Sequence, residues 1–293
     1  MMGTSPPETA VFEEVTLGHG AYFLANDRVY DLAVAFLNSF REQNPTIELC
    51  LIPFADDTAR IEALASRYGF SVWADADVLR RCDAIGERFH GEVLGHYRKL
   101  AAWEGEFDRF VYIDCDTVVL KPVDFVFEYL DRYPFVTSHS DIAGIRKFVW
   151  KDSIYGVPPL NRKQIRYSAN TGFVASRTDA LDLKQVEAGL DDALALAEHM
   201  ELMCCEQPLL NYLIVTSGRA YTSLWSLALR NRDWDIPQEQ WAGMSFDTVP
   251  DSPIPQSPTL LVHWAGEWEK SRRDGTPIPH RELWEHYRNM SEP

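Results

Sequence analysis

Two carboxylates placed two positions apart are the residues of this chain most suited to chemistry. Asp114 and Asp116 stand between two apolar runs, and residues 110–120 together predict one buried β-strand. Alternate residues of a strand share a face, so both carboxylates would point the same way. Two like charges at a buried strand end repel each other unless a cation, a hydrogen-bond network or a proton compensates. A divalent metal is the simplest compensation, and carboxylate oxygens suit Mg²⁺, Mn²⁺ or Ca²⁺.

A third metal ligand is expected at the end of another apolar run. Residues 259–264 predict a strand that carries His263 near its end, where an imidazole could join Asp114 and Asp116. A lone histidine in such a place is more often a hydrogen-bonded core residue than a ligand. Two neighbours favour the ligand: Gly266 would let backbone amides approach a phosphate, and Lys270 would neutralise it.

The elements that position these residues alternate between strands and helices. Short apolar runs at 21–25, 47–52 and 70–73 predict strands, and apolar periodicity predicts helices at 29–40 and 58–68. Such alternation indicates a parallel sheet with right-handed crossovers. No GxGxxG follows the first strand, so a Rossmann dinucleotide site is not supported.

The remaining residues predict one large α/β domain. Helical patterns occupy 96–104, 123–133, 183–199 and the residues after 204, a strand is predicted at 135–138, and 141–166 and 245–258 read as long irregular segments. We expect a flexible N-terminal arm at 1–18 and a single domain at 19–293. Its nucleotide-binding half would cover about 19–123, and its acceptor and donor half about 124–293.

Charge and cysteine content limit the partners and the cellular location that we expect for this protein. The chain has 28 basic and 44 acidic residues and a formal net charge of -16, which opposes nucleic acid and anionic membranes as partners. A metal and a few cations can still reverse the potential at one phosphate site. Five cysteines without zinc spacing, no signal-like N-terminus and no apolar run of membrane length predict a cytoplasmic protein without a membrane span. The sequence leaves a homodimer open.

Tryptophans crowd the C-terminal part of the chain. Aromatic rings form platforms on which sugars stack, but most tryptophans fill cores, and we expect core positions for the majority. The six are Trp225, Trp234, Trp241, Trp264, Trp268 and Trp284.

Six short motifs, in order over about residues 20 to 270, resemble the GT-A glycosyltransferases and, within them, the glycogenin-like glycosyltransferase family 8. A lone Asp-x-Asp is a weak signal, whereas six ordered matches are a strong one. The motifs are Asn26-Asp27, Arg98-Lys99-Leu100 with Trp103, the run from Tyr112 to Val119, Asn170-Thr171-Gly172, the run from Glu206 to Asn211, and the run from His263 to Gly266.

The resemblance implies a fold, a cofactor and a reaction. The fold would be a Rossmann-like, mixed and mainly parallel sheet flanked by helices. The protein would be a retaining glycosyltransferase that moves a hexose from a UDP-sugar to an unknown acceptor, with Mn²⁺ or Mg²⁺ held by Asp114, Asp116 and His263. The residues expected around the donor sugar, as a catalytic group, are Lys99, Asn170, Glu206 and Gln207. Those expected to bind the UDP and its metal are Ala25, Asn26, Tyr30, Lys99, Asp114, Cys115, Gly266 and Lys270.

Two other readings stay open. The run from Asp114 to Val118 also matches the first motif of haloacid-dehalogenase-like phosphatases, but that motif normally opens the domain, and here three β/α units precede it. A catalytically silent nucleotide-sugar-binding protein would use the same residues as a transferase. No serine lies in a nucleophile-elbow spacing, so serine hydrolase chemistry has no support.

Overall fold

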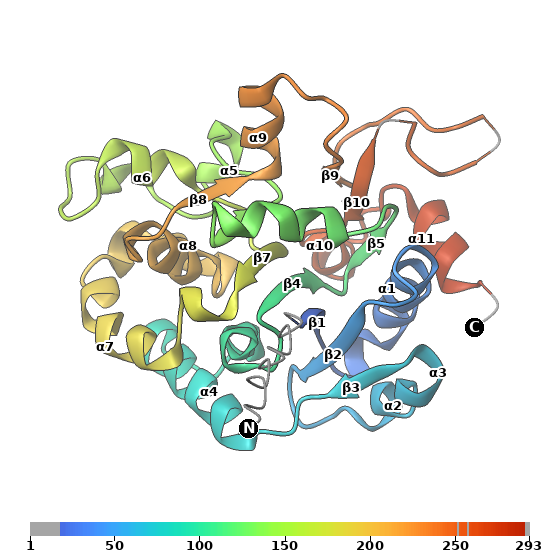
Figure 1. The fold of residues 1–293 in the computed structure, drawn as a ribbon, viewed down its shortest axis with the longest axis horizontal. Helices are drawn as coiled ribbons and strands as arrows, with labels where there is room; N and C mark the ends of the chain where they lie inside the picture. The colour runs from blue at the N-terminus through green and yellow to red at the C-terminus, as the bar shows by residue number, and fades with distance from the viewer. Residues whose placement is uncertain (1–17, 251, 257, 291–293) are drawn as a thin grey trace, which may run out of the picture.

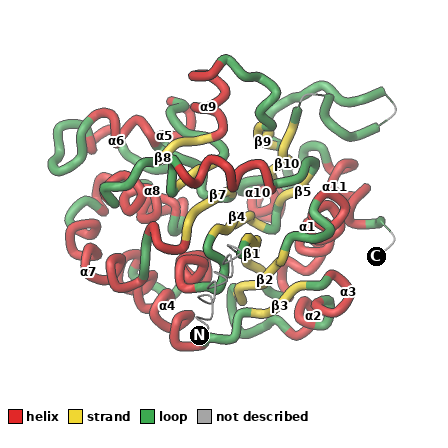
Figure 2. Tube along the Cα trace, viewed as in Figure 1, coloured by secondary structure: helices red, strands yellow, loops and turns green. Residues whose placement is uncertain are grey.

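The computed structural model describes residues 18–250, 252–256 and 258–290, so all but the last residue of the predicted N-terminal arm lies outside the described residues. The fold contains a seven-stranded sheet with the strand order β3-β2-β1-β4-β7-β6-β8 and a three-stranded sheet with the order β5-β10-β9 (Figure 1). Helices lie on both sides of the larger sheet (Figure 2). The mixed α/β architecture predicted from the sequence is confirmed.

The N-terminal half of the large sheet is parallel because helical segments connect its strands. Its strands are β1 (His19–Ala25), β2 (Glu48–Pro53), β3 (Phe70–Val72) and β4 (Arg109–Asp114). The connecting helices are α1 (Tyr30–Gln43), α2 (Ala59–Glu62), α3 (Ala65–Tyr68), α4 (Ala76–His90) and the 3₁₀ helix Gly95–Glu104.

The other half of the large sheet is mixed. β7 (Phe173–Arg177) is antiparallel to both β4 and β6 (Phe135–Thr137), and β8 (Tyr221–Ser223) is parallel to β6. The helical segments of this half are the 3₁₀ helix Asp124–Asp131, α5 (Ala143–Arg146), α6 (Arg162–Tyr167), α7 (Leu183–Leu194), α8 (Gln207–Thr216) and α9 (Leu224–Asn231). Four of the six strand pairings in the whole sheet are parallel, so the sheet is mainly parallel.

A separate small sheet explains one error of the sequence interpretation. Residues 110–120 are not one strand: β4 ends at Asp114 and β5 (Thr117–Val119) belongs to the small sheet. The chain bends because the Thr117 hydroxyl donates to the Asp114 carbonyl at 2.8 Å, while β5 pairs with β10. The two carboxylates therefore lie at the junction of two sheets and do not share the face of one strand. The other elements of this region are β9 (Gln238–Trp241), β10 (Thr259–His263), α10 (Glu267–Asp274) and α11 (Arg281–Arg288).

Alternating residues of β1 show how the large sheet is buried on both faces. Tyr22 and Leu24 pack into one apolar cluster, whereas Ala21, Phe23 and Ala25 pack into the other. Burial on both faces is usual for parallel strands and explains their nearly continuous apolar character. The carboxyl ends of β1 and β4 thus emerge from a rigid core and can hold polar residues in fixed positions.

Helix boundaries differ from the sequence predictions at several places. The predicted helix 58–68 is divided into α2 and α3, although Gly69 closes it in the left-handed conformation (φ 62°) as expected. The predicted helix 183–199 ends as an α-helix at Leu194. α4 was not predicted, although its buried Val78, Cys82 and Ile85 follow a helical spacing. Among the described residues, no helix has the length and apolar character needed to cross a membrane.

Candidate active site

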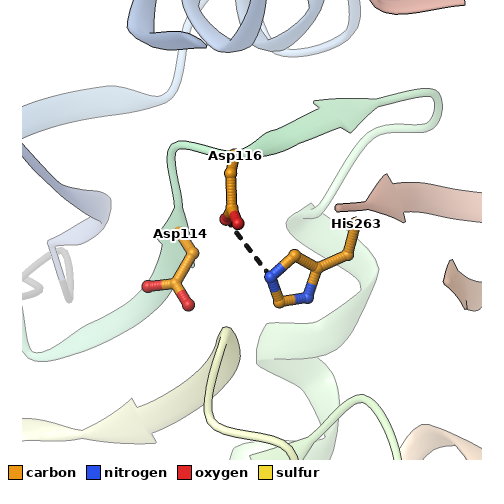
Figure 3. A group of neighbouring side chains, drawn as sticks. All are labelled: Asp114, Asp116 and His263. Atoms are coloured by element: carbon orange, nitrogen blue, oxygen red, sulfur yellow. Dashed lines mark ion pairs between the residues drawn. The ribbon is translucent and has the colours of Figure 1, made fainter. Parts of the chain in front are cut away.

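The three residues predicted to bind a metal lie together (Figure 3). Asp114 ends β4, Asp116 lies in the bend before β5, and His263 ends β10. One ligand atom from each lies within 4.8 Å of the others, and His263 Nε2 is 3.2 Å from Asp116 Oδ1. The backbone N–H of Trp264 donates to the Asp116 carbonyl at 3.0 Å, which ties the two sheets together at this point.

These three side chains fit a divalent cation. Two ligands on opposite sides of one ion are separated by at most twice the bond length of roughly 2.0–2.6 Å, so the observed spread is compatible with shared coordination. Gly172 leaves room for them: a Cβ atom there would lie 2.4 Å from His263 Cε1 and 2.9 Å from Asp114 Oδ2. Glycine is therefore the residue that this position requires, for reasons of space.

Replacing Gly172 by alanine should displace His263 and Asp114 and weaken metal binding. We expect Mn²⁺ affinity to fall at least about tenfold and stability to fall by about 1–3 kcal/mol, as in other overpacked sites. Calorimetric titration with Mn²⁺ and urea unfolding measure the two effects. Gly189→Ala is the matched control, because its Cβ would meet nothing within 4 Å and a helical alanine should be stabilising. Equal Mn²⁺ affinity in the two variants would contradict the proposed crowding.

Glu239 is a buried site residue that the sequence analysis missed. It lies in β9, accepts a hydrogen bond from the Trp241 indole N–H at 2.8 Å, and its Oε1 is 2.7 Å from His263 Nδ1. Its other oxygen accepts from the Ser138 hydroxyl. β9 is short and polar, so its sequence gives no strand signal, and the contact with His263 spans 24 positions.

The charges of this group fix the orientation of the imidazole. Burial alone would lower the pKa of His263, but Asp116 and Glu239 together raise this pKa well above its usual value. Burial alone would raise the pKa of Glu239, but the imidazoles of His139 and His263 lower it below its usual value. Glu239 is therefore ionised and holds one proton of His263 on Nδ1, and the raised pKa keeps a second proton on Nε2, which faces Asp116. A metal ion at Nε2 would take the place of this second proton.

Lys99 connects Asp114 with Glu206. Its ammonium lies 3.4 Å from Asp114 Oδ1 and 2.5 Å from Glu206 Oε1, and it donates to the Thr171 carbonyl at 3.0 Å. The Tyr112 hydroxyl donates to the same oxygen of Asp114 at 2.6 Å. Burial would lower the pKa of Lys99, but Asp114 and Glu206 raise it, so the lysine is charged. Asp114 is thus held in place by two donors, whereas Asp116 faces His263.

Removing the charge of Lys99 should destabilise the protein. Both Lys99 and the Glu206 side chain are almost fully buried, so Lys99→Met leaves a buried carboxylate without its counter-ion. We expect a loss of about 3–5 kcal/mol in unfolding free energy. The double variant Lys99→Met/Glu206→Gln should recover part of this loss, and the exposed Lys184→Met is the control. Urea unfolding measures the free energy of unfolding of the wild type and the three variants. A wild-type value for Lys99→Met would show that the ion pair contributes little to stability.

The other two predicted catalytic residues, Asn170 and Gln207, form hydrogen bonds to the backbone of the loop at residues 171–172. Asn170 accepts a hydrogen bond from the Gly172 N–H at 2.7 Å. Gln207 accepts from the Thr171 N–H at 3.2 Å and donates to the Phe148 carbonyl at 3.0 Å. Asn170, Glu206 and Gln207 therefore lie at the loop whose Gly172 is next to Asp114, and their contact with a sugar stays a prediction.

The residues predicted to contact uridine lie beside the carboxylates. β1 pairs with β4 so that Leu24 faces Asp114, and Ala25 and Asn26 follow directly. Asn26 is buried and donates to Asp57 Oδ1 at 2.9 Å. Tyr30 lines a pocket of about 240 Å³, and the Arg60 guanidinium lies 4.2 Å from the centre of its ring.

Three further residues were predicted to bind the UDP and its metal, namely Gly266, Lys270 and Cys115. Gly266 has φ 73° and precedes α10, so it needs the left-handed region that glycine tolerates. Lys270 is half-exposed and lies 3.5 Å from Glu267. The Cys115 side chain packs in the apolar core, where burial raises the pKa of its thiol well above the usual value, so only the backbone of Cys115 remains for a ligand.

Comparison with known proteins relies on structure, because no protein-family model matches the chain and no curated protein matches its sequence. The galactosyltransferase LgtC, solved with donor and acceptor sugar analogues, matches with a TM-score of 0.58 and 15% identity, over 94% of this chain and 97% of that one. The chain has the GT-A glycosyltransferase fold. An active-site variant of LgtC, with glutamate in place of glutamine, matches with a TM-score of 0.57 and 12% identity, over 91% of this chain and 94% of LgtC.

A second glycosyltransferase, GlyE of Streptococcus pneumoniae TIGR4, is also similar. It matches with a TM-score of 0.50 and 14% identity, over 93% of this chain and 61% of GlyE. The chain therefore spans about three fifths of the length of GlyE. Membership of glycosyltransferase family 8 stays a prediction.

Proposed function

We propose that this protein is a metal-dependent, retaining glycosyltransferase that moves a hexose from a UDP-sugar to an acceptor. The observation that carries the proposal is the meeting of Asp114, Asp116 and His263 where two sheets of a GT-A fold join. Ala25 and Asn26, at the end of the neighbouring strand, would contact the nucleotide beside this cluster. The two carboxylates of this donor set suit Mn²⁺ or Mg²⁺.

The proposed roles follow from charge and position. A bound Mn²⁺ or Mg²⁺ would supply positive charge to the diphosphate that leaves the sugar. Asp114, Asp116 and His263 would hold it, and the Lys99 ammonium would add a second positive charge on the side of Glu206. Glu206 would stabilise positive charge that develops on the sugar ring in an oxocarbenium-like transition state. Asn170 and Gln207 would orient the sugar hydroxyls.

The named functions of similar structures support the choice of substrate. LgtC is a galactosyltransferase solved with donor and acceptor sugar analogues, which favours a hexose donor here. A glutamine belongs to the active site of LgtC, which makes Gln207 a suitable candidate for a similar role. The alternative phosphatase reading gains nothing from the structure, because β4 is a central strand that three other strands precede in sequence.

Thermal unfolding with UDP and Mn²⁺ tests the proposal. We expect the two together to raise the unfolding temperature by several degrees, as a ligand at about a hundredfold excess over its Kd stabilises by about 2.7 kcal/mol. Either one alone should have a much smaller effect, because Asp114, Asp116 and His263 would hold the metal and its positive charge would favour binding of the diphosphate. Absence of any nucleotide effect, together with Mg²⁺-dependent hydrolysis of a phosphate ester, would favour the phosphatase instead.

A further inference from the structure

A row of aromatic rings leads away from the metal cluster toward the surface. The Trp241 indole donates to Glu239, the same carboxylate that orients His263. The ring centres then follow one another at short distances: Trp241 to His139 is 5.3 Å, His139 to Trp225 is 5.8 Å, and Trp225 to Trp234 is 6.3 Å. We call Trp241, His139, Trp225 and Trp234 the aromatic row.

Three elements bring the aromatic row together. Trp241 pairs with His263 in the register of β9 and β10, and His139 follows β6 by two residues. Trp225 lies in the first turn of α9, and its backbone N–H donates to the Ser138 carbonyl at 3.1 Å. The row is therefore built on β9, the chain after β6 and the start of α9, and Figure 1 labels α9 and β9.

The strand order places this row on the side of the metal cluster away from the proposed nucleotide site. Along one edge of the large sheet, the carboxyl ends of β1, β4, β6 and β8 carry Ala25, Asp114, Thr137 and Ser223, in that order. The proposed nucleotide site lies at Ala25 and the metal cluster at Asp114. The aromatic row begins beyond both, next to the ends of β6 and β8.

The outer end of the row is exposed. The Trp234 residue is 57% exposed, and Leu229 and Met244 nearby in the sequence are 46% and 59% exposed. Trp264, by contrast, is fully buried, and it is the one member of the six C-terminal tryptophans that is, so the expectation of core positions for most of them was wrong. An exposed apolar group that continues into half-buried rings beside a polar site is typical of a ligand-binding surface.

The chemistry of the row fits a sugar. A pyranose ring has an apolar C–H face that packs on an indole, and hydroxyl groups at its edge that hydrogen-bond to polar neighbours. The exposed Asp233 and Asp235 flank Trp234 in sequence, and the net charge of -16 adds to their effect, so an anionic ligand is disfavoured. We propose that Trp225, Trp234 and Trp241 form the acceptor subsite and that the acceptor is a neutral saccharide. This inference rests on the proposed function.

Binding to an array of immobilised neutral and anionic oligosaccharides, with UDP and Mn²⁺ present, tests the inference. The proteins compared are the wild type, Trp234→Ala, Trp234→Phe, and Val93→Ala as a control at a similarly exposed apolar residue. We expect the wild type and the control to bind at least one neutral oligosaccharide. Trp234→Ala should bind it about tenfold more weakly, whereas Trp234→Phe, which keeps a ring, should retain most of the binding.

Thermal unfolding of the same preparations with UDP and Mn²⁺ distinguishes failure of the acceptor inference from failure of the proposed function. If UDP and Mn²⁺ stabilise the wild type but no neutral oligosaccharide binds, or if only anionic ones do, the acceptor inference is wrong and the proposed function stands. Equal binding by Trp234→Ala and the wild type also overturns the inference. If UDP and Mn²⁺ do not stabilise the wild type, the proposed function fails, and the inference fails with it.

Discussion

Asp116→Asn is expected to abolish metal-dependent turnover of a UDP-sugar, with a loss of at least about a thousandfold. Its carboxylate faces His263, whereas Asp114 is already held by Lys99 and Tyr112. Asp116 is therefore the ligand with the most freedom to bind a metal directly. Loss of the metal removes several kcal/mol of stabilisation from the charged leaving group.

Two measurements separate this loss from a folding defect. Steady-state release of UDP measures turnover, and calorimetric titration with Mn²⁺ measures the metal site. Asp192→Asn is the control, because Asp192 is an exposed carboxylate on α7, away from the cluster. Both aspartate variants should unfold at nearly the wild-type temperature in the absence of metal. Full activity in Asp116→Asn would show that Asp116 is not a metal ligand.

Glu239→Gln is expected to weaken Mn²⁺ binding by about 10–100-fold, although Glu239 itself would not touch the metal. The glutamine keeps the shape of the side chain but loses the charge that holds the His263 proton on Nδ1. Glu239 now accepts hydrogen bonds from Trp241 and Ser138, and the glutamine would place an N–H₂ donor next to these two donors. The imidazole should then lose its fixed orientation toward Asp116.

A second substitution separates positioning from packing. Glu239→Ala leaves buried donors without an acceptor, so unfolding in urea should show a loss of about 3 kcal/mol or more. Glu48→Gln, an exposed glutamate at the start of β2, is the control and should change neither quantity. Unchanged Mn²⁺ affinity in a folded Glu239→Gln would mean that Glu239 has only a structural role.

The sequence predicted the parts of the site that depend on local signals. Apolar runs located β1, β2 and β4, and the residue types at their ends identified Asp114, Asp116 and His263. These predictions rest on short stretches in which strand propensity and a polar end coincide. α4 also carries local signals, because Asp75 caps it and Gly91 ends it in the left-handed conformation, but it was not predicted.

Other parts depend on contacts between distant residues. The apolar pattern continues through residues 110–120, so nothing local reveals that β5 leaves the large sheet to pair with β10. Glu239 becomes a site residue only when β9 pairs with β10 and brings it to His263. The tryptophans, by contrast, follow their local sequence: Trp264 directly follows the apolar run of β10 and is buried, whereas Trp234 lies between two aspartates and is largely exposed.

Release of UDP from a UDP-sugar without an acceptor tests the central claim most directly. UDP-glucose, UDP-galactose and UDP-N-acetylglucosamine are each incubated with the wild type and with Asp116→Asn, with Mn²⁺ and with a chelator. We predict slow release of UDP from at least one donor by the wild type with Mn²⁺, and no release with chelator or by the variant. No release from any donor by the wild type, or equal release in the presence of chelator, would contradict the account.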